Sequence, residues 1–182
     1  MKHYITLTLI SVFMSVISNQ LTAQSSKLPV DEETGKITYE EVVHVEGTKE
    51  ELFNRSISWI NSFYKNPLDV TRERNLANGV VKGLHRIKIK NTDKDGTKTD
   101  AGTVQYEFIL KFKDGRYRYV LTDFVLKRGS KIPVEKWMNK KDPQYNPQWQ
   151  SYLKQIEDFA QKWTESLKKG MQPPVEKKEE DW

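Results

Sequence analysis

Few side chains in this sequence could take part in catalysis. The chain has three histidines and no cysteine, which offers little for a zinc site or a covalent nucleophile, and it has no glycine-rich phosphate loop or nucleophile elbow. His85 and Asp123 fall on the apolar sides of two predicted strands, whose pairing could join them as an acid–base cluster. Hydrogen bonds to the backbone or to Tyr106 explain the same residues more simply. We therefore expect no catalytic residue and no enzyme.

The loop from Asn91 to Gly96 has the alternating oxygen ligands of the first half of a calcium-binding EF-hand loop. The second half does not match, because its twelfth position is Gly102, where a bidentate carboxylate is needed. A polar hairpin loop has the same composition. We therefore expect no bound metal and no cofactor.

Basic residues recur on the polar sides of the predicted strands. The candidate binding surface consists of Lys82, Arg86, Lys88, Lys90, Lys111 and Arg118. Such a face suits an acidic protein surface, an anionic polysaccharide or a lipid headgroup. The alternative is a solvated face whose lysines protect the sheet edges. We expect no nucleic-acid partner, because the aromatic side chains that could stack on bases point mainly to the other face.

Aromatic residues lie on the opposite sides of the same strands and along one stripe of the last predicted helix. Together they could enclose an apolar ligand in a pocket formed by Phe108, Phe112, Tyr117, Tyr119, Trp149, Phe159 and Trp163. The same side chains stabilise the fold by burial if they pack without a void. A ligand cavity and a filled core are thus two alternatives.

Alternation of apolar and polar residues predicts five strands, at 36–46, 70–76, 80–90, 104–112 and 117–125, with a polar loop over 91–102. Turn-forming pairs at 78–79 and 114–115 close two hairpins. A two-residue turn fixes the register of the second hairpin. Phe112 then faces Tyr117, and Lys111 faces Arg118. In the same register Tyr106 faces Asp123.

Residues at helical spacing predict two helices. The first spans 49–64 and begins at a capping box formed by Thr48 and Glu51. The second spans 148–169 with Gly170 as its C-cap, after an irregular, proline-containing connection over 128–147. Residues 171–182 are charged and predicted to be disordered. The order β-α-β-β-β-β-α favours an α+β fold: one curved antiparallel five-stranded sheet with both helices on one face and the other face left to solvent or a partner.

The first residues have the features of a secretory signal peptide. A basic start precedes an apolar run from Tyr4 to Ile17, and Ala23 can occupy the cleavage site. The run is too short to span a bilayer comfortably, and an uncleaved N-terminal anchor is the alternative. We expect residues 1–23 to be removed, residues 24–170 to form one domain without a transmembrane segment, and the protein to be periplasmic or extracellular. The formal charge of +5 is mildly basic, with acidic and basic residues interleaved.

Three short segments carry a resemblance to a known family: Leu28-Pro29-Val30-Asp31, Gly35-Lys36-Ile37 and Trp59-Ile60-Asn61. Over residues 28–126 the chain resembles the DUF4468 family, exported Bacteroidetes domains with a TATA-binding-protein-like (TBP-like) fold. The resemblance implies that fold and a bacterial lineage. It implies no activity and no functional residues, and the name of the fold does not imply DNA binding.

These observations favour a non-enzymatic binding or scaffolding module of the bacterial cell envelope. Its partner would be another envelope protein, an anionic glycan or a lipid. The alternative function is a carrier of a small apolar ligand held between the sheet and the last helix. The two functions differ in the core, since a carrier needs an enclosed void and a binding module needs a filled core with an exposed contact surface. The sequence leaves the oligomeric state open.

Overall fold

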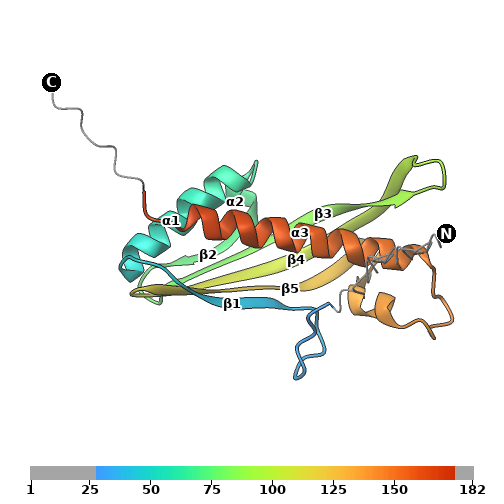
Figure 1. The fold of residues 1–182 in the computed structure, drawn as a ribbon, viewed down its shortest axis with the longest axis horizontal. Helices are drawn as coiled ribbons and strands as arrows, with labels where there is room; N and C mark the ends of the chain where they lie inside the picture. The colour runs from blue at the N-terminus through green and yellow to red at the C-terminus, as the bar shows by residue number, and fades with distance from the viewer. Residues whose placement is uncertain (1–27, 175–182) are drawn as a thin grey trace, which may run out of the picture.

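The computed structural model describes residues 28–174. Figure 1 shows a curved sheet with two long helices lying across the same side of it. This is the α+β architecture that the sequence predicted. The predicted signal peptide at 1–23 and residues 175–182 of the predicted tail lie outside the described residues. Within residues 28–174, no helix has both the length and the apolar composition that crossing a membrane requires.

The described strands form one six-stranded antiparallel sheet. Their bounds are β1 Tyr39–His44, β2 Thr71–Asn75, β3 Val80–Thr92, β4 Lys98–Lys113, β5 Arg116–Arg128 and β6 Ser130–Pro133. The strand order is β1-β5-β4-β3-β2, and β6 pairs with the C-terminal end of β5. Five strands were predicted. The sixth arises because the chain turns back at Gly129, whose φ is 67°, inside the segment that was expected to be irregular.

β3 and β4 are longer than the sequence predicted. Pairing of Thr92 with Lys98 extends their ladder through most of the expected loop over 91–102. Residues 92–100 at this end are exposed, so the strands show no apolar alternation there.

The described helices are α1 Lys49–Phe63, α2 Pro67–Val70, the 3₁₀ helix η1 Val134–Met138 and α3 Gln148–Gly170. α1 begins at the predicted capping box. The Thr48 hydroxyl accepts a hydrogen bond from the Glu51 amide at 3.2 Å, and the Glu51 carboxylate accepts one from the Thr48 amide at 2.7 Å. η1 buries Val134 and Trp137, so the prediction of an irregular connection over 128–147 is wrong there as well as at β6.

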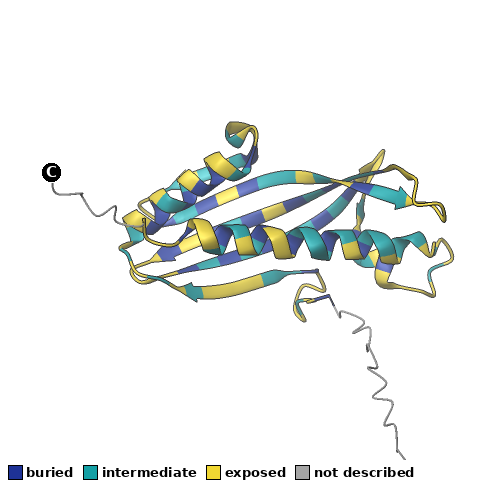
Figure 2. Cartoon of the chain, turned by 45° about the horizontal axis from the view of Figure 1, so that its top comes forward, coloured by how far each residue is buried: buried dark blue, intermediate teal, exposed yellow. Residues whose placement is uncertain are grey.

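α1 and α3 cover the inner face of the sheet. On α3, four side chains are fully buried against the strands: Ile156, Ala160, Trp163 and Leu167. Figure 2 shows buried residues alternating with exposed ones along the strands beneath the helices. Removal of this apolar surface from water supplies the main stabilisation of the fold.

The C-terminal end of α3 differs from the prediction. Gly170 is the last helical residue and not the C-cap, and a Cβ atom there would lie 2.7 Å from Trp59 Cδ1. A glycine at this position therefore permits the close approach of α3 to α1. Met171 is the cap, is fully buried, and accepts a hydrogen bond on its carbonyl from Arg55 Nη1 at 3.3 Å. The predicted disorder from residue 171 onward is therefore wrong at Met171.

A β-bulge interrupts the ladder between β4 and β5. Phe112 faces Tyr117 as predicted, but the register shifts next to Tyr106, which does not face Asp123. Asp123 has a φ of 54°, a conformation that aspartate adopts more readily than most residues. The extra residue reverses the alternation along β5, so that Phe124 is buried and Asp123 leaves the inner face.

Candidate functional site

A hollow beside the β4–β5 turn is lined by basic side chains. It has a volume of about 460 Å³, and Val42 and four cations line it: Lys111, Lys113, Arg116 and Arg118. Lys111 faces Arg118 as predicted, and Lys113 faces Arg116. All four lie on the side of the sheet away from the helices, because they alternate with buried residues. We call this hollow, with its four cations, the basic hollow. Sequence reasoning missed its second pair, which the two-residue turn at 114–115 could have revealed.

The charges of the basic hollow are only partly neutralised. Among residues 28–174, Arg118 alone of the four forms an ion pair, with Nη2 lying 2.6 Å from Glu40 Oε2. Arg118 Nε is buried and has no hydrogen-bond partner in the described part of the chain. Like charges directly opposite each other destabilise a sheet. Two such pairs in succession therefore oppose folding, and an anion bound in the hollow would relieve that repulsion.

The remaining predicted basic residues lie outside the basic hollow. Lys82 Nζ forms an ion pair with Glu73 Oε2 at 2.7 Å, and Arg86 lines a different hollow. Lys88 and Lys90 follow further along β3, up to eight positions or roughly 27 Å from Lys82. The six predicted residues therefore do not form one continuous binding surface.

Five of the seven predicted pocket residues are buried in the core, and the other two, Trp149 and Phe159, are partly buried against it. The rings of Phe108 and Tyr119 lie 5.6 and 6.0 Å from that of Trp163, and all three side chains are buried. The other four pack elsewhere: Phe112 on Phe53, Tyr117 opposite Val43, Trp149 on Tyr145, and Phe159 on Tyr106. This packing favours the filled core over the ligand cavity.

His85 and Asp123 do not form an acid–base pair. Asp123 Oδ1 lies 2.5 Å from Lys36 Nζ, and this hydrogen bond raises the pKa of Lys36. The β-bulge is the physical reason, because it moves Asp123 off the inner face. His85 Nδ1 instead lies 3.5 Å from Tyr106 Oη, the hydroxyl that the sequence offered as its simpler partner.

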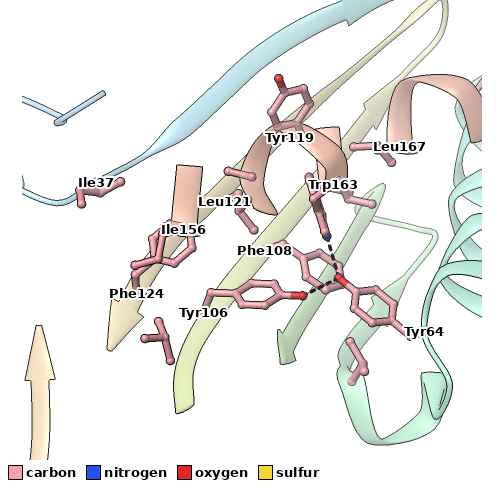
Figure 3. Close-up of a cluster of buried hydrophobic side chains, with 14 of the residues drawn as sticks. Ile37, Tyr64, Tyr106, Phe108, Tyr119, Leu121, Phe124, Ile156, Trp163 and Leu167 are labelled. Atoms are coloured by element: carbon pink, nitrogen blue, oxygen red, sulfur yellow. Dashed lines mark hydrogen bonds between the residues drawn. The ribbon is translucent and has the colours of Figure 1, made fainter. Parts of the chain in front are cut away.

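A chain of buried hydrogen bonds leads from α3 to Tyr106 (Figure 3). Trp163 Nε1 donates to Tyr64 Oη at 2.7 Å, and Tyr64 Oη lies 3.1 Å from Tyr106 Oη. Burial raises the pKa of Tyr64 to about 12, and it raises the pKa of Tyr106 as well. Both hydroxyls therefore keep their protons at neutral pH and can act as donors.

The loop from Asn91 to Gly96, with its EF-hand-like ligand spacing, closes on itself as a turn. Asp95 accepts hydrogen bonds from the amide and the hydroxyl of Thr97, both at 3.0 Å. The Gly96 amide donates to the Asp93 carbonyl oxygen at 2.9 Å. In the part of the chain that the structure describes, no group of three or more histidine or acidic side chains could hold a metal ion.

Comparison with known proteins identifies the fold. Residues 39–127 match the family described as "Domain of unknown function (DUF4468) with TBP-like fold". A TBP-like protein from Parabacteroides distasonis ATCC 8503 has a TM-score of 0.63 at 16% identity, covering 79% of this chain and 96% of that one. A DUF4468 family protein from Bacteroides ovatus ATCC 8483 has a TM-score of 0.60 at 17% identity, covering 82% and 94%. No curated protein matches the sequence. α3 follows the matched residues in the chain.

Proposed function

Residues 39–127 match the DUF4468 family with its TBP-like fold, and a fold alone implies no activity. From the uncovered face of the sheet we propose a binding function. The protein is a non-enzymatic binding module of the bacterial cell envelope. The uncovered face of its sheet holds an acidic segment of another envelope protein in the basic hollow. The envelope location rests on the predicted signal peptide at 1–23.

The observation that carries this proposal is the pair of like-charge contacts across β4 and β5. Lys111 faces Arg118 and Lys113 faces Arg116 on the same side of the sheet. If one member of each pair were acidic, the two pairs would stabilise the hairpin. The same arrangement favours binding of an anionic partner. Among residues 28–174 only Arg118 of the four forms an ion pair, with Glu40, so the other three cations can pair with the partner.

The spacing of the four cations suits an extended acidic peptide. Side chains two positions apart on a strand are roughly 6.8 Å apart, which holds for Lys111 and Lys113 as well as for Arg116 and Arg118. A peptide in β-conformation presents alternate carboxylates at the same interval. Val42 adds an apolar contact at the hollow, and 49% of its surface is exposed.

Two further features support binding over catalysis or ligand transport. The only candidate acid–base pair among the described residues, His85 with Asp123, is separated because Asp123 is bound to Lys36. Trp163 and its neighbours on α3 occupy the space between helix and sheet, whereas a carrier of an apolar ligand needs a void there.

The test is a titration of the mature chain, from residue 24, with a synthetic peptide of alternating glutamate and threonine. We expect saturable binding that weakens as salt is raised. Lys111→Gln and Lys113→Gln should each weaken it several-fold. Lys88→Gln is the matched control, since it removes one exposed lysine from β3, outside the hollow, and should leave the affinity unchanged.

Two results would overturn this assignment. Absence of saturable binding at low salt would contradict an anion-binding function for this face. Equal weakening by Lys88→Gln would show a general charge effect and not a site. If a polyuronate binds more tightly than the peptide, and Lys111→Gln weakens its binding to the same extent, the partner is an anionic glycan and not an acidic protein segment. Circular dichroism of each variant checks that the fold is intact.

A further inference from the structure

A second hollow opens where β2 ends its pairing with β3. Thr71, the first residue of β2, pairs with Gly83, and the residues of β3 that follow Gly83 have no β2 partner. α2 and its flanking residues lie there instead, and the hollow between them and β3 has a volume of about 260 Å³. Its lining residues come from α2 and its N-cap, β2, β3 and β4: Asn66, Asp69, Arg72, Leu84, His85, Arg86 and Gln105. Six of these seven side chains are polar or charged.

The hydrogen-bond chain from α3 determines which nitrogen of His85 carries its proton. Trp163 Nε1 can only donate, so Tyr64 Oη accepts from it. If Tyr106 also donated to Tyr64, the Tyr64 proton would be buried without an acceptor in the described part of the chain. Tyr64 therefore donates to Tyr106, and Tyr106 donates to His85 Nδ1 at 3.5 Å. His85 is thereby held as the neutral tautomer with its proton on Nε2.

Burial, together with the nearby Arg86, lowers the pKa of His85. The imidazole is therefore neutral at physiological pH, and Nε2–H is the polar group that it can offer to a ligand in the hollow. Nε2 has no hydrogen-bond partner among the described residues. The packing of Tyr64 against His85, with ring centroids 5.0 Å apart, holds the ring in place.

The lining of this hollow favours an anion with several acceptor oxygens. Arg72 and Arg86 each present a planar guanidinium with a fork of donors, which suits a carboxylate or a phosphate. The amides of Asn66 and Gln105 add further donors. Asp69 is the one carboxylate among the lining residues, so the cations outnumber it.

We propose that the hollow between α2 and β3 binds a small molecule that carries an oxyanion, a carboxylate or a phosphate. Arg72 and Arg86 bind the oxyanion, and His85 Nε2–H donates to it in an orientation fixed by Tyr106. This site is separate from the basic hollow and does not rest on the function proposed above.

The experiment is a nuclear magnetic resonance titration of the ¹⁵N-labelled mature chain with two probes, inorganic phosphate and succinate. We expect saturable shifts at residues 66–72 and 84–86, in the millimolar range or below, with at least one probe. The more tightly bound probe identifies the kind of oxyanion. Arg72→Gln and Arg86→Gln should each weaken binding by about tenfold.

Arg74→Gln is the matched control, because Arg74 lies on the same strand as Arg72 but outside the hollow, and it should bind the probes as the wild type does. Lys111→Gln should also have no effect, which separates this site from the basic hollow. Tyr106→Phe should shift the imidazole ¹⁵N resonances of His85 toward those of mixed tautomers, a change that a purely structural role for Tyr106 would not produce.

Three results would overturn the proposal. These are shifts that do not saturate with either probe, saturable shifts at other residues only, and equal loss of affinity in Arg74→Gln. A wild-type ¹⁵N spectrum of the His85 ring in Tyr106→Phe would remove the role assigned to the hydrogen-bond chain.

Discussion

Replacement of Tyr64 by phenylalanine tests the buried hydrogen-bond chain directly. The variant keeps the ring and its packing but removes the oxygen that accepts from Trp163 Nε1 at 2.7 Å. Trp163 is fully buried, so its N–H is left without an acceptor, at a cost of about 1–3 kcal/mol. We expect Tyr64→Phe to lower the free energy of unfolding by about 2 kcal/mol and Tm by about 6 °C.

Tyr39→Phe is the matched control for this prediction. The Tyr39 hydroxyl is buried and has no hydrogen-bond partner among the described residues, so its removal should leave stability unchanged or raise it. Urea unfolding followed by tryptophan fluorescence measures both variants on one scale. Equal changes for Tyr64→Phe and Tyr39→Phe would refute the reasoning, because the two substitutions delete the same atom and differ only in its partners.

Three further predictions concern packing, backbone conformation and pH. Gly83→Ala should cost about 1–3 kcal/mol, since its Cβ would lie 2.1 Å from Phe108 Cζ, and a wild-type urea midpoint would contradict this. Asp123→Asn should be tolerated, whereas Asp123→Val should lose about 1–3 kcal/mol at a φ of 54°, and similar melting temperatures for the two would argue against strain there. The hydrogen bond from Lys168 and then that from Tyr119 lower the pKa of Glu41 below 4.5. The stabilisation from these hydrogen bonds is complete above the pKa of Glu41 in the unfolded chain and is lost as pH falls through its lower pKa in the folded protein. Glu41→Gln should therefore show a smaller fall of Tm below about pH 4.5 than the wild type. Identical curves of Tm against pH for the two proteins in this range would contradict the prediction.

The main elements could be predicted because their sequence signals are local. The capping box at Thr48 and the strict alternation from Val104 to Phe112 depend on neighbouring residues only. The β-bulge at Asp123 was missed because the register was carried unchanged from the turn, although the alternation breaks where polar Thr122 and Asp123 precede apolar Phe124. β6 was missed because four residues with one proline carry a strand signal only when β5 is beside them.

The two candidate sites differ in the same way, since one follows from a local sequence signal and the other depends on the tertiary structure. The cross-strand pair Lys111 and Arg118 follows from a two-residue turn and was predicted correctly. The hollow at His85 could not be predicted, because Asp69 and Arg72 reach it from α2 and β2, and nothing in the sequence indicates that β2 stops pairing at Gly83.

The position of α3 in the chain has a consequence for biosynthesis. Phe108 and Tyr119 pack against Trp163 of α3, and Trp163 bonds to Tyr64 across 99 positions of sequence. A nascent chain therefore cannot close its interior until α3 has been synthesised, and contacts at such separation slow folding. A product ending at residue 127 would retain the whole stretch that matches the family and yet expose Tyr106 and Phe108 to water, so it should aggregate during synthesis.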